Sequence, residues 1–130
     1  MITFTIPGKP FGKQRPRFGN GRTYTPKETV SFESTVRGYA MKAFDKPIEG
    51  PVRLTVLATF ETPKSWSKKK TADMIHRHHT QKPDFDNIIK AIEDGMNRIA
   101  YIDDSQVAEY GPSRKMWGNV SQTVVIVEEI

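Results

Sequence analysis

Two pairs of aspartates and a lysine in the second half of the chain have the residue types of a cation-assisted phosphate site. Asp84 and Asp86 flank Phe85, and Asp103 and Asp104 follow further along the chain. Residues two apart in extended backbone point to the same side, so the carboxylates of Asp84 and Asp86 can converge on one cation. Asp86 is also expected to cap the helix that follows, at the positive end of the helix dipole.

The helix after Asp86 adds further polar groups beside these carboxylates. Lys90 lies four residues after Asp86, and Asp94 lies four residues after Lys90, so the three share one helix face. A helix over residues 86–98 rises about 18 Å. Residues 98–104, if extended, span about 20 Å, which is enough to return Asp104 to the start of the helix.

Carboxylate oxygens in a chain without cysteine favour a hard cation. Mg²⁺ is usually held by one or two carboxylates and keeps waters and phosphate oxygens as its other ligands. Such an ion can activate water toward a phosphodiester, while Lys90 holds the scissile phosphate or stabilises charge in the transition state. Each motif alone also has an ordinary explanation, as a helix cap, a turn or a solvated helix face. Together, in a basic chain, they favour a metal-dependent nuclease.

The elements that must position these residues can be predicted from hydrophobic periodicity. Strands are expected over residues 2–6, 52–61, 105–117 with an interruption at Gly111-Pro112, and 119–128. Helices are expected over residues 26–44, 67–76 and 86–98, and Lys9–Tyr24 is expected to be a loop. This mixture predicts an α+β, or mixed α/β, fold: a single sheet of about four strands packed with two or three helices. The 130 residues fit one domain over residues 1–130.

The first and third helices each have a predicted buried face. Thr25 is expected to be the N-cap of the first helix, with Pro26 at the first helical position and Glu28 closing a capping box. The residues of the first helix expected in the core are Phe32, Val36, Tyr39, Ala40 and Ala43. Those of the third helix are Ile88, Ile89, Ile92, Met96 and Ile99, opposite its polar stripe.

Positive charge is concentrated in two segments. The chain has 20 Lys and Arg against 15 Asp and Glu, a net charge of +5, and residues 1–27 hold six basic side chains and no acid. Residues 64–82 hold six more, with three histidines and one acid. Such clusters attract polyanions such as DNA. The residues expected to contact DNA are Lys9, Lys13, Arg15, Arg17, Arg22, Lys68, Lys69 and Lys70.

Aromatic and histidine side chains lie in or near both basic segments. Phe11, Phe18 and Tyr24 are candidates for stacking on bases. Two tryptophans, Trp66 and Trp117, are expected in the core or in an interface. A zinc site at His76, His78 and His79 is a weak alternative, because their spacing on a polar segment favours DNA contact or solvation.

The cysteine count and the hydropathy exclude several classes of protein. A chain without cysteine has no disulfide bonds, thiolate zinc sites or cysteine nucleophiles. No apolar run approaches the roughly 18 residues of a membrane helix, and the N-terminus lacks the pattern of a secretory signal. We therefore expect a cytoplasmic protein with no membrane partner and no small-molecule cofactor beyond the metal.

The acidic motifs read Asp84-Phe-Asp86-Asn87-x-x-Lys90-x-x-x-Asp94 and Asp103-Asp104-x-Gln106-Val107. With Pro7-Gly8 and Lys13-x-Arg15-Pro16-Arg17 near the N-terminus, they resemble the motifs of the RusA-type Holliday-junction resolvases. The resemblance implies a homodimeric, Mg²⁺-dependent endodeoxyribonuclease that resolves four-way (Holliday) DNA junctions by paired symmetric nicks during recombination and repair. It also implies that Asp84, Asp86 and Asp104 bind the metal and that Lys90 is the catalytic lysine. The long, His-rich stretch of residues 65–81 does not match these motifs, so junction and cleavage-sequence preferences are expected to differ from those of family members.

Other functions are compatible with parts of this pattern. A structure-specific DNA-binding protein with weak catalysis would keep the basic loop, but it would not need Asp84, Asp86, Lys90 and Asp104 together. A Mg²⁺-dependent nuclease for other branched DNA would use the same residues. An enzyme acting on small nucleotides would not need so large a basic loop.

Overall fold

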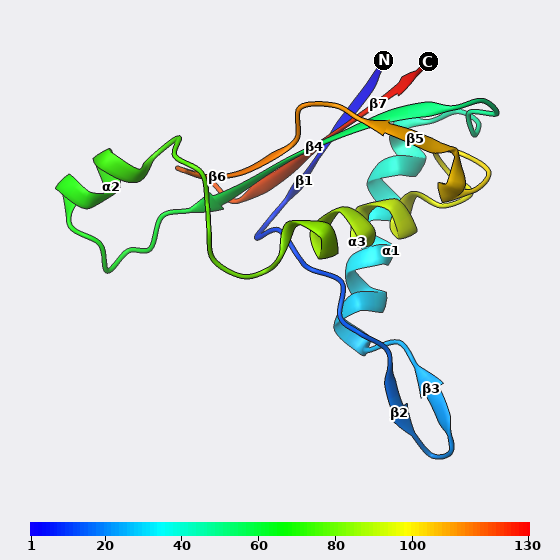
Figure 1. Ribbon diagram of the computed structural model, residues 1–130, viewed down its shortest axis with the longest axis horizontal. Coiled ribbons are helices and arrows are strands. Elements are labelled where there is room, and N and C mark those ends of the chain that lie inside the picture. The colour runs from blue at the N-terminus through cyan, green and yellow to red at the C-terminus, as the bar shows by residue number, and fades with distance from the viewer.

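The computed structural model describes residues 1–130 and contains a mixed five-stranded sheet (Figure 1). The strands in spatial order are β1 (Ile2–Pro7), β7 (Gln122–Glu129) and β4 (Val52–Glu61), followed by β5 (Val107–Tyr110) and β6 (Arg114–Gly118), which both pair with the outer edge of β4. Both neighbours of β7 are antiparallel to it, whereas β5 and β6 run parallel to β4. The two chain termini lie side by side at one end of the sheet (Figure 1).

The two short strands share one edge of β4 because the chain bends between them at Gly111-Pro112. Pairing of β5 with β4 ends at Leu54↔Tyr110, and pairing of β6 begins at Leu57↔Arg114. A Cβ atom at Gly111 would lie 2.1 Å from Thr55 Oγ1, so a side chain does not fit at this close approach. The predicted interruption is confirmed, and it makes five strands where about four are predicted.

Helices α1 (Lys27–Ala43) and α3 (Phe85–Met96) pack against each other and cover one face of the sheet (Figure 1). The buried face of α3 includes Ile88, Ile92 and Met96, as its periodicity predicts. Gly95 allows α1 to come close, because a Cβ atom there would lie 2.6 Å from the Cβ of Val36. Each large apolar side chain buried in this core contributes about 1.5–3 kcal/mol. No helix is long and apolar enough to cross a membrane.

Two smaller elements project from this body at separate places (Figure 1). One is α2 (Lys68–Met74), which begins at Ser67, whose Oγ accepts a hydrogen bond from Lys70 N at 3.1 Å. The other is a hairpin of β2 (Arg17–Gly19) and β3 (Arg22–Tyr24). Its turn is Asn20-Gly21, where both residues have positive φ, the geometry that favours this dipeptide in tight hairpins. The expectation of an irregular loop over Lys9–Tyr24 is therefore wrong for the hairpin.

The α+β class and most predicted elements are confirmed, but two helix starts differ from prediction. Pro26 is the N-cap of α1 and has extended backbone, with ψ 145°, so the helix begins at Lys27 and no side chain caps it. The capping box of Thr25 and Glu28 does not form. In α3 the N-cap position belongs to Asp84, two residues before the predicted Asp86.

Candidate active site

The start of α3 carries two exposed aspartates. Asp84 Oδ1 accepts a hydrogen bond from Lys82 Nζ at 2.8 Å, and this bond, together with the lysine's charge, lowers the pKa of Asp84. Asp86 lies in the first turn, where its Oδ1 accepts from the backbone N of Asn87 at 2.9 Å. Because the helix begins at Phe85, only Asp84 is in extended backbone. The predicted convergence of both side chains in one extended segment is therefore not the local geometry.

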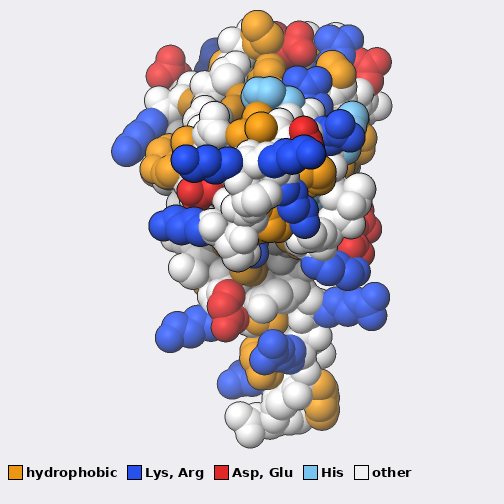
Figure 2. All heavy atoms as spheres, turned by 90° about the vertical axis from the view of Figure 1, so that its left-hand side faces the viewer, with side chains coloured by type: hydrophobic (Ala, Val, Ile, Leu, Met, Phe, Trp, Pro, Cys, Tyr) orange, Lys and Arg blue, Asp and Glu red, His pale blue; other side chains and the backbone are white.

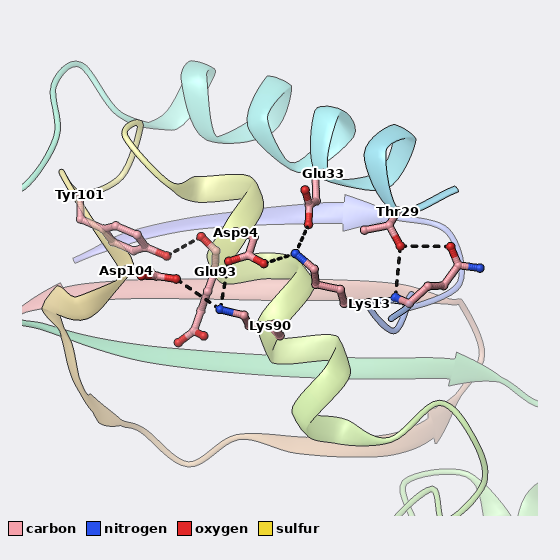
Figure 3. Close-up of polar contacts among 9 residues, drawn as sticks. Lys13, Thr29, Glu33, Lys90, Glu93, Asp94, Tyr101 and Asp104 are labelled. Carbon is pink, nitrogen blue, oxygen red and sulfur yellow. Dashed lines mark hydrogen bonds and ion pairs between the residues drawn. The ribbon is translucent and has the colours of Figure 1, made fainter. Parts of the chain in front are cut away.

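Lys90 lies one turn further along the same face of α3, between two carboxylates (Figure 3). Its Nζ is 3.3 Å from Asp94 Oδ1 and 3.5 Å from Asp104 Oδ2. Partial burial acts to lower the pKa of Lys90, but the charges and hydrogen bonds of the two aspartates outweigh it and raise the pKa. Lys90 is therefore held as a half-exposed ammonium group beside Asp104. The chain does return Asp104 to α3, as the length of residues 98–104 allows.

The 3₁₀ helix η1 (Asp104–Gln106) determines which aspartate of the Asp103-Asp104 pair faces α3. Asp103 is exposed and caps η1, because its Oδ2 accepts from the backbone N of Ser105 at 3.0 Å. Hydrogen bonds from Ser105 lower the pKa of Asp103. With Asp103 turned to this cap, Asp104 is the carboxylate that contacts Lys90.

Gln106 fixes the position of η1 against the chain that precedes β4. Its Oε1 accepts from the backbone N of Ile102 at 2.8 Å and of Asp103 at 3.0 Å. Its Nε2 donates to the carbonyl oxygens of Ile48 at 2.8 Å and Gly50 at 2.9 Å. One side chain thus satisfies four backbone groups, and this explains a glutamine two residues after Asp104 in structural terms.

Lys13 is placed differently from the other basic residues of the N-terminal segment (Figure 3). Its half-buried Nζ is 3.1 Å from Glu33 Oε2 on α1 and also donates to Asp94 on α3. Partial burial acts to lower the pKa of Lys13, but these two carboxylates raise it. Lys13 therefore joins α1 to α3 through Asp94, which itself contacts Lys90. This placement favours a role in holding the site over the DNA contact predicted from the sequence.

The backbone on either side of Lys13 is fixed to the same two helices. Lys13 N donates to Asn87 O at 2.9 Å. Gln14 N donates to the buried Thr29 Oγ1 at 3.1 Å, and Thr29 donates in turn to Gln14 Oε1 at 3.1 Å (Figure 3). The segment that leads to the hairpin is therefore anchored beside the first turn of α3.

Sequence reasoning missed a buried carboxylate next to this network. Glu93 is 8% exposed, and its Oε2 accepts from Tyr110 OH at 2.7 Å. Its backbone oxygen accepts from Tyr101 OH at 2.8 Å (Figure 3). Burial raises the pKa of Glu93 more than the Tyr110 bond and the Lys90 charge lower it. No sequence signal pairs Glu93 with a tyrosine 17 residues away, or Lys13 with a glutamate 20 residues away.

The three aspartates predicted to bind metal are not gathered into one preformed cluster. No group of three or more His, Cys, Asp or Glu side chains lies close enough together to hold a metal ion. The donors available are the exposed carboxylates of Asp84 and Asp86 and the half-buried one of Asp104. This all-oxygen set fits Mg²⁺, which takes one or two carboxylates and completes its shell with water and phosphate oxygens.

The seven other predicted DNA contacts are all exposed and free of ion pairs. These are Lys9, Arg15, Arg17, Arg22, Lys68, Lys69 and Lys70. Figure 2 shows Lys and Arg side chains gathered over the end of the molecule that carries α2 and again toward the hairpin. Lys70 also lies over the Trp66 ring, with its Nζ 4.5 Å from the ring centre.

The aromatic candidates for base stacking differ in exposure. Phe18 is 77% exposed and Tyr24 is 49% exposed, both on the hairpin. Phe11 instead stacks on Phe32 of α1, with ring centres 5.1 Å apart, which makes it part of the fold. The predicted packing role of the tryptophans is confirmed, since Trp117 is 5% exposed and lies against Trp66.

The histidine segment is built into the fold. His79 is buried and stacks on Phe60, whereas His76 and His78 are exposed. Burial, with the charges of Lys115 and Lys9, lowers the pKa of His79 to about 4.

Two comparisons place the chain among known proteins. The family model described as endodeoxyribonuclease RusA matches residues 7–128. The protein YqaN of Bacillus subtilis (strain 168), described as uncharacterized, is 33% identical over 138 aligned residues. That alignment covers 99% of this chain and 96% of YqaN.

Proposed function

This chain belongs to the RusA endodeoxyribonuclease family, and we propose that it is a Mg²⁺-dependent endonuclease that resolves four-way DNA junctions by paired symmetric nicks. Recombination and repair are the processes that produce such junctions. The observation that carries the proposal is the position of Lys90, held between Asp94 and Asp104 one turn from Asp86. This position puts the Lys90 ammonium group one turn from the carboxylates at the exposed start of α3.

In this proposal each residue of the site has its own task. Asp84, Asp86 and Asp104 would hold Mg²⁺, which would supply Lewis acidity to the scissile phosphate. Lys90 donates a hydrogen bond to a phosphate oxygen and stabilises the negative charge that builds on it in the transition state. Asp94 keeps the Lys90 ammonium group aimed at the mouth of the site.

Paired nicks require two active sites on one junction, so we propose that the enzyme acts as a homodimer. The exposed hairpin and α2 would then contact the DNA backbone beside each site, with arginine and lysine neutralising phosphates. Sedimentation or light scattering of the free chain and of its junction complex tests the dimer.

A second candidate is a Mg²⁺-dependent nuclease acting on other branched DNA. The same carboxylates and lysine would serve it, since the chemistry at the phosphate is the same. The third candidate is not a nuclease but a DNA-binding protein without strong catalysis. Such a protein would not need Lys90 to lie between Asp94 and Asp104.

One experiment separates these functions. A synthetic four-way junction, a flap and a linear duplex are each incubated with the protein in Mg²⁺ or in EDTA. We expect two symmetric nicks in the junction with Mg²⁺ and no cutting in EDTA. Faster cutting of the flap would select the second candidate, and tight junction binding without cutting would select the third.

A further inference from the structure

A cavity of about 640 Å³ lies beside Asp84 but outside the carboxylate site. It is walled by the end of β4, by the chain that leads to α2, by β6 and by residues of the 79–82 segment. Small-molecule sites in proteins have volumes of roughly 300–1,000 Å³. This cavity is therefore large enough for one nucleotide and far too small for a duplex arm, whose major groove alone is about 12 Å wide.

Three aromatic side chains that are 3–6% exposed, Phe60, His79 and Trp117, form the floor of the cavity. The His79 ring stacks on Phe60, with ring centres 3.8 Å apart and planes 12° apart, and it lies 4.5 Å from the Trp117 ring. His79 is 6% exposed, and its Nδ1 has no hydrogen-bond partner within the protein. Buried polar atoms are nearly always hydrogen-bonded, so this buried nitrogen is an exception within the aromatic cluster.

The rim of the cavity is positively charged. Lys9, Lys64 and Lys82 line it, all exposed, against a single acid, Glu61. Figure 2 looks onto the end of the molecule that carries α2, where Lys and Arg side chains gather with histidines among them. An apolar floor below a cationic rim fits a ligand with an aromatic part and an anionic part.

The wall that carries His79 is held rigidly on β6. His79 N donates to Lys115 O at 3.0 Å, and Trp117 N donates to Arg77 O at 3.0 Å. Lys115 Nζ donates to the carbonyl oxygens of Gln81 and Pro83, each at 2.7 Å. The cavity is therefore preformed, and its wall runs directly into the start of α3. Lys82 belongs to both places, since it lines the cavity and pairs with Asp84.

We propose that this cavity binds one unpaired nucleotide of the DNA substrate, with its base on the Phe60, His79 and Trp117 floor and its phosphate at the lysine rim. The inference rests on the proposed function, because it takes the strand to be the one whose phosphate lies at α3. Only a nucleotide that has left the base stack can enter, and leaving the stack costs least where the base is already unpaired. The cavity would thus favour branch points over linear duplex.

The test uses variants at exposed positions of the rim, so that folding is preserved. Val120 lines the cavity and is 62% exposed, and Val120→Trp fills its mouth. Val30→Trp, at a 53% exposed position on α1, is the matched control. Lys64→Glu reverses a rim charge, and Lys46→Glu makes the same change at an exposed site that does not line this cavity.

The probes are thymidine monophosphate, a short single-stranded oligonucleotide and a duplex of the same sequence, each added to the full chain. The readout is the NMR signal of the Trp117 indole together with binding affinity. We expect the single strand to shift the Trp117 signal and the duplex to leave it unchanged. Val120→Trp should weaken single-strand binding about tenfold, the loss of roughly one base-stacking contact. Lys64→Glu should also weaken it, through loss of a phosphate contact, while both controls bind as the wild type.

Several results would overturn the inference. One is a Trp117 signal that the single strand does not shift. Another is a Val120→Trp variant that binds the single strand as tightly as the wild type does. Thymidine monophosphate binding as tightly as the strand would identify a free-nucleotide site instead. Failure of the proposed function would be seen separately, as absent junction cutting in Mg²⁺ with the Trp117 response intact.

Discussion

Among the single residues of the site, Lys90 belongs to a chain of alternating charges that runs from Asp104 to Glu33. It contacts Asp104 and Asp94, and Asp94 contacts Lys13, which contacts Glu33. These alternating charges come from η1, α3, the N-terminal segment and α1 (Figure 3). A half-exposed ion pair contributes little stability alone, commonly 0–1 kcal/mol, but it restricts where each side chain can point. The network is therefore best understood as a means of orienting Lys90.

Substitution of the two neighbouring aspartates should have opposite kinds of effect. Asp104→Asn should abolish cutting with little loss of stability, because Asp104 faces Lys90. Asp103→Asn should cut at a rate close to that of the wild type, and Asp103→Ala should lower the free energy of unfolding slightly through loss of the cap. Single-turnover cleavage and urea denaturation measure the two effects. An inactive Asp103→Asn variant together with an active Asp104→Asn variant would show that Asp103, and not Asp104, belongs to the active site.

Lys13 provides a second test at this scale. In Lys13→Met, Asp94 keeps only Lys90 as a partner and should draw it away from Asp104. We expect the single-turnover rate at saturating enzyme to fall about tenfold, as for loss of roughly 1.4 kcal/mol of transition-state stabilisation. Lys13→Arg should recover part of the rate.

A direct phosphate contact by Lys13 predicts a different outcome. The slope of log affinity against log salt would then become shallower by about 0.9, with an unchanged rate at saturation. Measuring affinity across a salt series for the wild type and Lys13→Met distinguishes the two roles. We expect the slope of the variant to match that of the wild type.

Among the elements, the β2–β3 hairpin is separated from the site by the anchored residues Lys13 and Gln14. The anchor fixes Lys13 and Gln14 to α3 and α1, while the hairpin beyond it carries exposed Arg17, Phe18 and Arg22. A projecting, basic element with exposed aromatic residues is suited to contact with a large polyanion.

Removing charge from this hairpin should affect binding and spare the chemistry. The double variant Arg17→Ala/Arg22→Ala should bind a junction more weakly, with a salt slope shallower by up to about 1.8, and cut near normally once enzyme saturates the DNA. Its stability should stay within about 0.5 kcal/mol of the wild type, because both side chains are exposed. A large loss of cleavage rate at saturating enzyme, with an unchanged salt dependence of binding, would instead place the hairpin in the active site.

The hairpin also illustrates what local sequence can and cannot predict. Strands over residues 2–6 and 52–61 and the buried face of α3 follow from periodicity and are confirmed. Asn20-Gly21 is a hairpin signal that the irregular composition around it obscures. The predicted capping box of Thr25 and Glu28 is wrong, because Pro26 itself takes the N-cap position and the helix begins only at Lys27.

The arrangement of the site is predictable only in part. Spacing along one helix predicts that Asp86, Lys90 and Asp94 share a face, and chain length allows Asp104 to reach it. The pairing of Lys13 with Asp94 spans 81 residues and depends on how α1 packs on α3, which no local pattern encodes. The choice of Asp104 over Asp103 depends on the η1 cap, which is equally invisible to spacing.

For the whole molecule, the buried His79 links stability to pH. Its pKa in the folded state is about 4, against 6.5 for an ordinary histidine, so the unfolded chain binds the proton more readily. The free energy of unfolding should therefore decrease as pH falls from about 6.5 to about 4, by at most about 1.4 kcal/mol per pH unit from this residue. His79→Phe should remove this part of the pH dependence, and the exposed His78→Gln should not. Equal pH dependence of urea denaturation in the wild type, His79→Phe and His78→Gln would contradict this role of His79.

The proposed nuclease activity requires that the carboxylates at the start of α3 form the catalytic site. The direct measurement is single-turnover cleavage of a four-way junction by Asp86→Asn in Mg²⁺, with junction affinity measured on the same protein. Asp86 is exposed and its side chain bonds only the adjacent backbone, so the variant should fold as the wild type does. We predict that cutting is lost while binding is unchanged or tighter, because removal of a negative charge lowers repulsion toward phosphate. Cutting at the wild-type rate, or loss of binding in the folded variant, would contradict the assignment.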